Sequence, residues 1–235
     1  MVDLFGFDDA AEVHGTEAMS YVHPDDREAI RQRMHHVLDD GEESDWIGWR
    51  LLRNDGAIRH VESRGTPVEY EGRPAVQVVI RDMTDERRRE RQLRALADAV
   101  RDLAATDTPA TAAETAVEAV ETLFADPAVV VFERVDGTFF ELATGGAAVT
   151  LAAEGGGLPE SAIEAEVHAA GEPRTVEGYA DHGDGLTDRV GAVSLYPLAD
   201  HGLLWVGADG FDAADRDLLA VLGQSLVCAF DRLAA

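Results

Sequence analysis

Histidine, acidic and glycine-rich segments are the parts of this chain that could do chemistry, but none has the spacing of a catalytic or metal site. His35 and His36 are adjacent, so on a helix they point about 100° apart and cannot easily share a metal ion. The acidic loop from Asp181 to Asp188 does not follow the EF-hand spacing of a calcium site. The glycines at 155–157 lack the Lys-Ser or Lys-Thr that completes a phosphate loop. These patterns predict no metal site and no catalytic residue, and they indicate no particular cofactor.

Aromatic residues in the second half of the chain are candidates for a small-molecule pocket. Such pockets are lined mainly by apolar and aromatic side chains. The candidates are Phe132, Phe140, Tyr179, Tyr196 and Trp205. Aromatic residues on strands also build ordinary core, so the sequence leaves both interpretations open.

The single cysteine limits the chemistry further. Cys228 has no second thiol to pair with, which excludes disulfides within the chain, thiolate zinc sites and paired-thiol redox chemistry. Its apolar helical surroundings favour a buried side chain. We therefore expect no enzyme activity; a reductase acting on free methionine sulfoxide would need several cysteines.

The charge of the chain is strongly acidic, with 46 Asp plus Glu against 20 basic residues, all of them Arg, and a net charge of -26. Dense carboxylates keep a surface hydrated in molar salt, where the Debye length is about 3 Å, so the composition is typical of halophilic proteins. Binding to phosphate needs clustered cations, and we expect no direct contact with nucleic acid or membrane. No apolar run approaches the roughly 18 residues of a membrane span, which favours a cytoplasmic protein.

The first half of the chain reads as one helix followed by three strands. Pro24 suits a first helical turn, and apolar residues then recur on one face, which predicts a helix from about 24 to 40. Alternating segments at 46–53, 57–70 and 74–81 are separated by turn residues. They predict a three-stranded antiparallel meander.

An Arg-rich helix is expected to follow from Thr84 to about residue 105, with leucines at heptad-like spacing. The final helix, capped by Asp212, has a similar leucine repeat. Together these repeats predict a homodimer that pairs through both helices. The expected interface residues are Leu93, Leu96, Val100, Leu103, Leu219, Leu222 and Leu226.

A second domain begins after the break at 106–109. It reads as a helix, a hairpin of strands 128–134 and 138–144, a short helix near 160–170, a second hairpin of strands 190–198 and 202–208, and the final helix. The sequence therefore predicts an α+β fold with antiparallel sheets, divided into residues 1–83, a helical connector at 84–105, and residues 106–235.

The first segment resembles the C-terminal part of a PAS domain. The resemblance rests on His23-Pro24-Asp25-Asp26-Arg27, Arg53-Asn54-Asp55-Gly56 and Arg81-Asp82-Met83-Thr84, in that order. Leu4-Phe5-Gly6-Phe7 looks like the region that follows the second strand of that family. The first two strands then have no counterpart, which leaves strand 74–81 with an unpaired edge. This leaves three alternatives: the PAS domain is shortened, the start of the chain is lost or misassigned, or a partner supplies the two missing strands.

The second segment is similar to a GAF domain of the kind found in the bacterio-opsin activator family of halophilic archaeal regulators. The similar pieces are Gly171-Glu172-Pro173-Arg174, Ser194-Leu195-Tyr196-Pro197-Leu198, Asp200-His201-Gly202 and the final helix. Because the helix-turn-helix of that family has no counterpart here, direct DNA binding is not implied.

The order sensor domain, helix, sensor domain predicts a non-catalytic signalling protein. A ligand or partner would be sensed by either domain and relayed through a dimeric connector helix. Candidates for the output partner are a histidine kinase and a helix-turn-helix regulator. The alternative is a transcriptional regulator of the bacterio-opsin activator type that acts through a separate DNA-binding partner.

Overall fold

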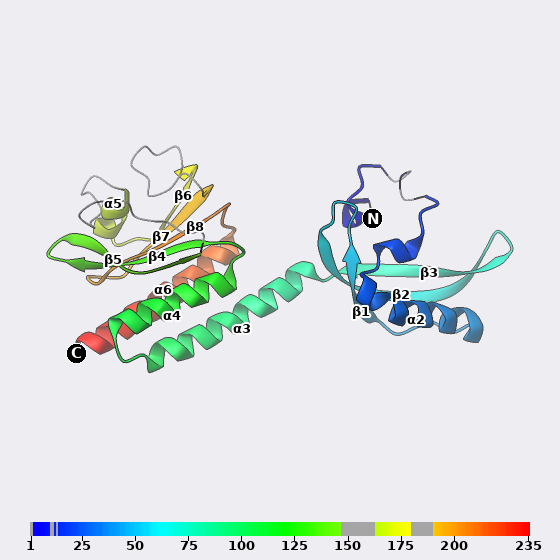
Figure 1. Ribbon diagram of the computed structural model, residues 1–235, viewed down its shortest axis with the longest axis horizontal. Helices are drawn as coiled ribbons and strands as arrows, with labels where there is room; N and C mark the ends of the chain where they lie inside the picture. Colours follow the sequence, from blue (N-terminus) through cyan, green and yellow to red (C-terminus); the bar gives the residue numbers. More distant parts are fainter. Residues whose placement is uncertain (1, 10–11, 13, 147–162, 180–189) are drawn as a thin grey trace. The chain divides into compact units, whose positions relative to one another are not determined.

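A computed structural model describes the chain except for residues 1, 10–11, 13, 147–162 and 180–189. The described residues form helices and two antiparallel sheets, in two compact units, Met1–Glu90 and Arg91–Ala235 (Figure 1). We call them the N-terminal unit and the C-terminal unit. The α+β fold class predicted from the sequence is confirmed.

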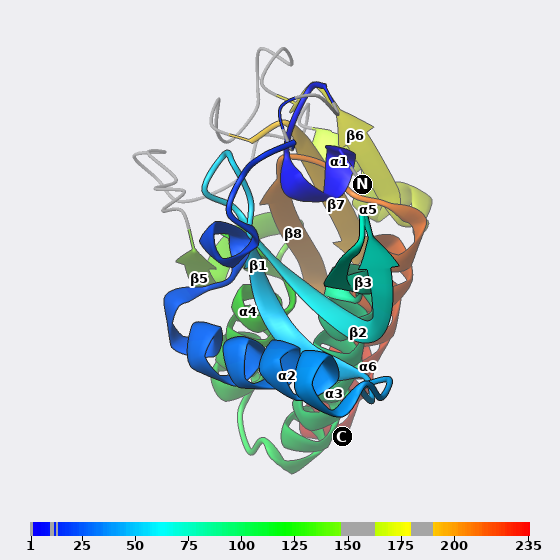
Figure 2. The same cartoon turned by 90° about the vertical axis from the view of Figure 1, so that its right-hand side faces the viewer.

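The N-terminal unit is built on a three-stranded sheet of order β1-β2-β3, formed by β1 (Ile47–Leu52), β2 (Ile58–Tyr70) and β3 (Arg73–Asp82). Both pairings are antiparallel, which confirms the predicted meander. Three short helical segments come first, α1 (Val2–Phe5), η2 (Ala18–Tyr21) and η3 (Pro24–Asp26), and α2 (Arg27–Asp40) then packs on the sheet (Figure 2). Among the described residues, the outer edge of β3 pairs with no strand.

Capping explains where the helix of this unit begins and ends. The His23 ring accepts the backbone N–H of Asp25, Pro24 fills the first turn, and Gly41 ends α2 in the left-handed conformation at φ 66°. Asp26 then ties this end to the sheet, because its carboxylate accepts the backbone N–H of Arg50 at 2.9 Å and two guanidinium nitrogens of Arg50 at 2.8 and 3.0 Å. Asp26 thus holds the start of α2 against β1.

The C-terminal unit has a five-stranded sheet of order β5-β4-β8-β7-β6 with apolar residues on both faces. Its strands are β4 (Ala128–Val135), β5 (Thr138–Gly146), β6 (Arg174–Glu177), β7 (Ala192–Pro197) and β8 (Gly202–Ala208), and its helices are α4 (Pro109–Leu123), α5 (Ile163–Ala170) and α6 (Ala213–Ala234). Helices α4 and α6 cover one face and α5 packs on the other (Figure 1). Thr108 and Asp212 begin α4 and α6 with capping boxes, the latter as predicted.

Helix α3 (Thr84–Ala105) has the predicted bounds, and its later turns join the core of the C-terminal unit. Leu96, Ala99 and Leu103 are buried there, and the Gln92 amide donates to the Leu123 carbonyl at 3.0 Å.

Strand β6 was not predicted, because a segment of four residues is too short to show alternation. Within the described part of the chain, no helix is long and apolar enough to cross a membrane.

Replacing Asp26 tests the link between α2 and β1. Hydrogen bonding to Arg50 lowers the pKa of Asp26 from 3.8 to about 2. The ionised form therefore stabilises the fold fully above pH 3.8, and this contribution is lost as the pH falls through about 2. We expect Asp26→Asn to lower the free energy of unfolding by about 1–2 kcal/mol at pH 7, allowing for partial solvent exposure, and by nearly nothing at pH 2.

Urea unfolding of the two proteins at each pH measures this difference. Asp25→Asn is the matched control, because the Asp25 carboxylate lies 3.2 Å from the same guanidinium but its side chain is 70% exposed. Equal losses for the two variants would contradict the assignment to Asp26.

Candidate functional site

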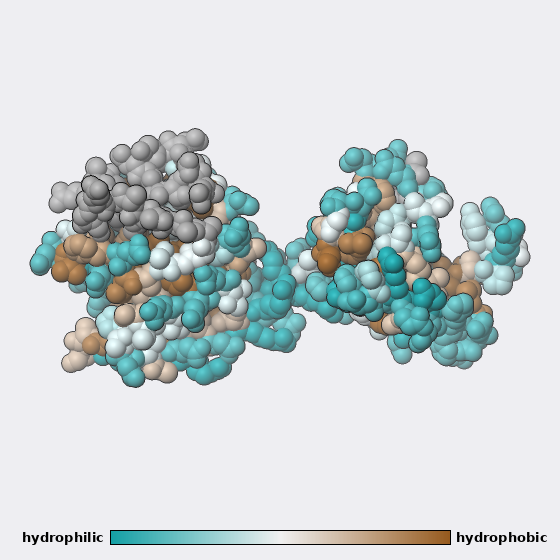
Figure 3. Space-filling model, in the orientation of Figure 1, coloured by the Kyte–Doolittle hydropathy of each residue, from teal (hydrophilic) through white to brown (hydrophobic). Residues whose placement is uncertain are grey.

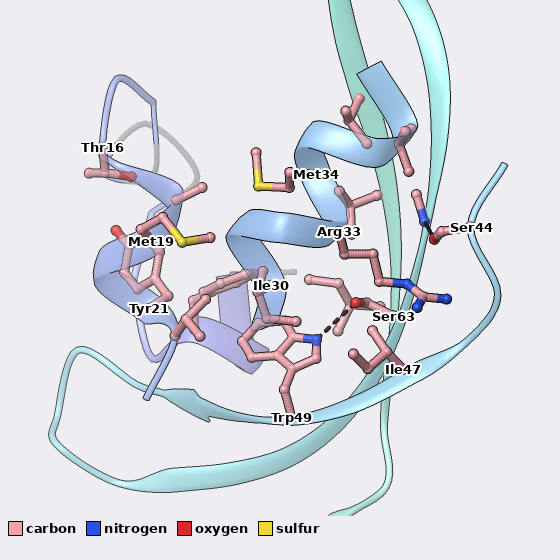
Figure 4. Close-up of a pocket in the computed structure, with 18 residues that line it drawn as sticks. Thr16, Met19, Tyr21, Ile30, Arg33, Met34, Ser44, Ile47, Trp49 and Ser63 are labelled. Carbon is pink, nitrogen blue, oxygen red and sulfur yellow. Dashed lines mark hydrogen bonds between the residues drawn. The ribbon is translucent and has the colours of Figure 1, made fainter. Parts of the chain in front are cut away.

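A cavity of about 310 Å³ lies in the N-terminal unit between α2, η2 and the sheet. Ile30, Met34 and Val37 face it from α2, since they recur at helical spacing. Met19 and Met34 point into the space between η2 and α2 (Figure 4). The cavity is lined by Phe5, Thr16, Ala18, Met19, Tyr21, Val22, Ile30, Arg33, Met34, Val37, Ser44, Ile47, Trp49, Ser63, Gly65, Val76, Val78 and Ile80. Its wall is thus mainly apolar, as in ligand pockets generally.

The polar groups of the cavity are few: Ser44, Ser63 and Arg33 lie together on one side, and the hydroxyls of Thr16 and Tyr21 lie on the other (Figure 4). The Trp49 indole donates to the Ser63 hydroxyl at 2.8 Å, and the Gly65 N–H donates to the Ser44 hydroxyl at 2.9 Å (Figure 4). Arg33 is the only charged residue among the described residues that line the cavity. One of its terminal nitrogens donates to the Asp45 carbonyl at 2.8 Å, while its Nε is buried without a partner in the described part of the chain. Arg33 can therefore still donate a hydrogen bond.

The strand that carries Ser63 also holds the start of α3. The backbone N–H of His60 donates to the Thr84 hydroxyl at 3.0 Å, and the Met83 N–H donates to the His60 carbonyl at 2.8 Å. Thr84 in turn donates its N–H to the Asp82 carboxylate at 2.9 Å. The segment Arg81-Asp82-Met83-Thr84 thus attaches the first turn of α3 to β2 at His60. His60 is three residues along the strand from Ser63, which lines the cavity.

Three of the five predicted pocket aromatics share a buried cluster in the C-terminal unit. Phe132, Tyr179 and Trp205 lie on the face of the sheet that carries α5, and each is at most 1% exposed. The rings of Tyr179 and Trp205 meet edge to face, with centroids 5.8 Å apart.

The other two aromatics lie elsewhere. Phe140 is opposite Glu133 and is 36% exposed; its neighbour Phe139 joins the cluster instead, because adjacent strand residues face opposite sides. Tyr196 lies on the face covered by α4 and α6, packed on the backbone of α6 at Gly223. A single pocket lined by all five aromatics is therefore not formed.

A buried carboxylate that the sequence did not single out lies in the aromatic cluster. Glu164, on α5, is 0% exposed, and the Tyr179 hydroxyl donates to its Oε1 at 2.5 Å. The Trp205 indole N–H points at the same hydroxyl at 3.4 Å. No spacing pattern marks a lone glutamate in a short helix, so sequence reasoning had no signal for it.

The predicted dimer interface is mostly covered within one chain. Leu96, Leu103, Leu219, Leu222 and Leu226 are at most 7% exposed and form part of the helical core. Only Leu93 and Val100 remain exposed, at 62% and 36%. Heptad-like leucine spacing occurs both in helices that face a core and in helices that face a partner. Here most of the leucines with this spacing face the core of the C-terminal unit.

The remaining candidates do not form a site in the described residues. Cys228 is exposed on α6, so the expectation of a buried thiol is wrong. No cluster of three or more metal-binding side chains occurs in the described ranges. The acidic loop at 181–188 and the glycines at 155–157 lie outside them.

Comparison with known proteins supports the division into two kinds of fold. Residues 1–80 match the family model of the PAS fold. The GAF domain of a phosphoenolpyruvate-protein phosphotransferase from Coxiella burnetii matches with a TM-score of 0.53 and 16% identity, covering 62% of this chain and 95% of that chain. Free methionine-R-sulfoxide reductase from Neisseria meningitidis matches with a TM-score of 0.53 and 15% identity, and the match covers 61% of this chain and 90% of that chain.

One similar structure extends over nearly the whole chain. The chromophore-binding domain of a bacteriophytochrome from R. palustris matches with a TM-score of 0.50 and 13% identity, covering 99% of this chain and 86% of that chain. No curated protein matches by sequence. At these identities the structural likenesses show the fold alone. The chain thus combines a PAS fold at its N-terminus with a GAF-like fold.

Proposed function

We propose that this chain is a non-catalytic sensor whose N-terminal cavity binds a small, largely apolar ligand. The observation that carries the proposal is the cavity itself, a mainly apolar space of about 310 Å³ with Arg33 as the charged residue among the described residues of its wall. That volume is at the lower end of known ligand pockets. At about 30 Å³ for each water-sized atom, it has room for roughly ten non-hydrogen atoms.

Arg33 indicates the polar end of that ligand. Its buried Nε is an N–H donor without a partner among the described residues, and a buried donor favours a ligand that supplies an acceptor. A carboxylate would gain most, because hydrogen bonds between charged groups are stronger than neutral ones. A short fatty acid has the required combination of apolar body and acidic head.

Octanoate is the probe that tests the cavity. The chain has three tryptophans, so 5-fluorotryptophan labelling gives three ¹⁹F signals, assigned with Trp46→Phe and Trp49→Phe. We expect octanoate to shift the Trp49 signal and to leave the Trp205 signal in place. Arg33→Met keeps the apolar stem and should weaken octanoate binding by about tenfold or more.

Octylammonium is the control ligand, with the same chain and the opposite charge. Arg31→Met is the control variant, since Arg31 lies on the same helix but pairs with exposed Glu28 at 2.7 Å. An unmoved Trp49 signal, or equal affinity for octanoate in the Arg33 and Arg31 variants, would contradict the proposal.

The sensed signal would leave the cavity through β2. Ser63 contacts the cavity, and His60 on the same strand is bonded to Thr84 at the start of α3. A ligand that favours one position of β2 would then also favour one position of the first turn of α3.

Thr84→Val tests this relay, because it removes the hydroxyl and keeps the shape of the side chain. We expect octanoate to slow hydrogen exchange of the amides at 85–94 in the wild type but not in Thr84→Val, although both bind octanoate equally. The variant should also lose about 1 kcal/mol of stability. Thr122→Val, which removes a hydroxyl bond within α4, should keep the response; a response retained by Thr84→Val would refute the relay.

A homodimer is part of the proposal, and the exposed face of α3 supports it. Leu93, Ala97, Val100 and Ala104 are exposed at spacings typical of a coiled-coil seam. The same stripe on a second copy would pair with it about a two-fold axis.

Leu93→Asp should convert the dimer to a monomer in light scattering, because it places a charge in that seam. Leu93 is 62% exposed, so the fold of the monomer should survive, which Leu96→Asp in the core would not guarantee. Val135→Asp, at an exposed valine outside α3, is the control and should leave the mass unchanged. An unchanged mass for Leu93→Asp would exclude this seam.

The output is proposed to pass to a separate protein, either a histidine kinase or a helix-turn-helix regulator. Hydrophilic side chains dominate the visible face of the chain (Figure 3), and the net charge of -26 opposes direct contact with DNA. A transcriptional role of the bacterio-opsin activator type would therefore need a DNA-binding partner.

A further inference from the structure

The buried carboxylate of Glu164 is unusual because only one of its oxygens is used. Oε1 accepts the Tyr179 hydroxyl at 2.5 Å, whereas Oε2 is buried without a hydrogen-bond partner in the described part of the chain. Glu164, Tyr179 and Trp205 are all 0% exposed. An ionised carboxylate buried in this way is costly unless a donor or a positive charge faces it.

The described neighbours do not supply a cation. In the described part of the chain, the Tyr179 hydroxyl is the hydrogen-bond partner of Oε1, and no arginine or histidine bonds to Oε2. His168 follows Glu164 by one turn of α5, but burial lowers its pKa from 6.5, so its ring is neutral at pH 7. Arg174, on the strand that follows α5 in the chain, pairs with exposed Glu166 at 3.6 Å.

We infer that Glu164 is the recognition group of a second ligand site, in the C-terminal unit, for a small molecule with a protonated nitrogen. The ammonium group would donate to Oε2, and the Tyr179 hydroxyl would hold Oε1 so that the free oxygen keeps its direction. The aromatic rings of Tyr179 and Trp205 suit both an apolar body and a positive charge. This site is independent of the cavity in the N-terminal unit.

The first test needs no ligand. A group kept for binding rather than for folding costs stability, so Glu164→Gln should melt at or above the temperature of the wild type in ligand-free full-length protein. A partner supplied from within the fold, including the segments outside the described residues, would instead make the variant melt lower and would overturn the inference. Glu166→Gln, on the same helix but exposed, is the matched control.

The second test uses benzylammonium, with benzyl alcohol as its neutral analogue and benzoate as its anionic one. In fluorotryptophan-labelled protein, benzylammonium should shift the Trp205 signal and leave the Trp49 signal in place. Its affinity should exceed that of the two analogues by about tenfold or more, and Glu164→Gln should abolish this preference while Glu166→Gln keeps it.

Equal responses of Trp205 to the three compounds, or no response, would overturn the inference. Tyr179→Phe gives a second comparison, because it keeps the carboxylate and removes the group that orients it. Its preference for benzylammonium should fall but not vanish; complete retention would contradict the role of Tyr179. Because Trp49 and Trp205 report separately, a failure of this site and a failure of the N-terminal cavity are distinguishable.

Discussion

The hydrogen bond from the His60 N–H to the Thr84 hydroxyl is the interaction on which the proposed sensor depends. Strand β2 pairs with both of its neighbours, so its backbone is fixed along most of its length. Ser63 places the Trp49 indole at the cavity, and His60 places the first turn of α3. One strand therefore contributes to the cavity wall and holds the start of the helix, which is why the proposed relay runs through β2.

Local signals in the sequence were enough for most elements. Proline and histidine at the start of α2, Gly41 at its end, and Asp212 before α6 act within one turn, so their effect can be read without knowing the fold. Long-range choices could not be read in this way. Whether a leucine stripe meets a core or a second chain depends on how the helices are connected, and Leu96 and Leu93 lie on the same helix with opposite outcomes.

The candidate sites were harder to predict because they depend on strand register and on single residues. Phe139 and Phe140 are adjacent, and only the pairing of Phe139 with Arg134 decides which of them faces the cluster of Phe132. The apolar stripe of α2 was visible in the sequence, but the space left between it and the sheet was not. Arg33 and Glu164 belong to no repeating pattern; only their surroundings show an unused donor in one case and an unused acceptor in the other.

The two groups proposed to bind ligands, Arg33 and Glu164, are of opposite chemical type, basic and acidic, in a chain with a net charge of -26. In molar salt the Debye length is about 3 Å, so the overall charge can neither attract a cationic ligand nor repel an anionic one over a useful distance. Buried groups in direct contact with a ligand are screened much less. In a solvent of that ionic strength, selectivity would have to come from contacts in dry sites, where a single guanidinium or carboxylate at an apolar wall can provide it and a charged surface cannot.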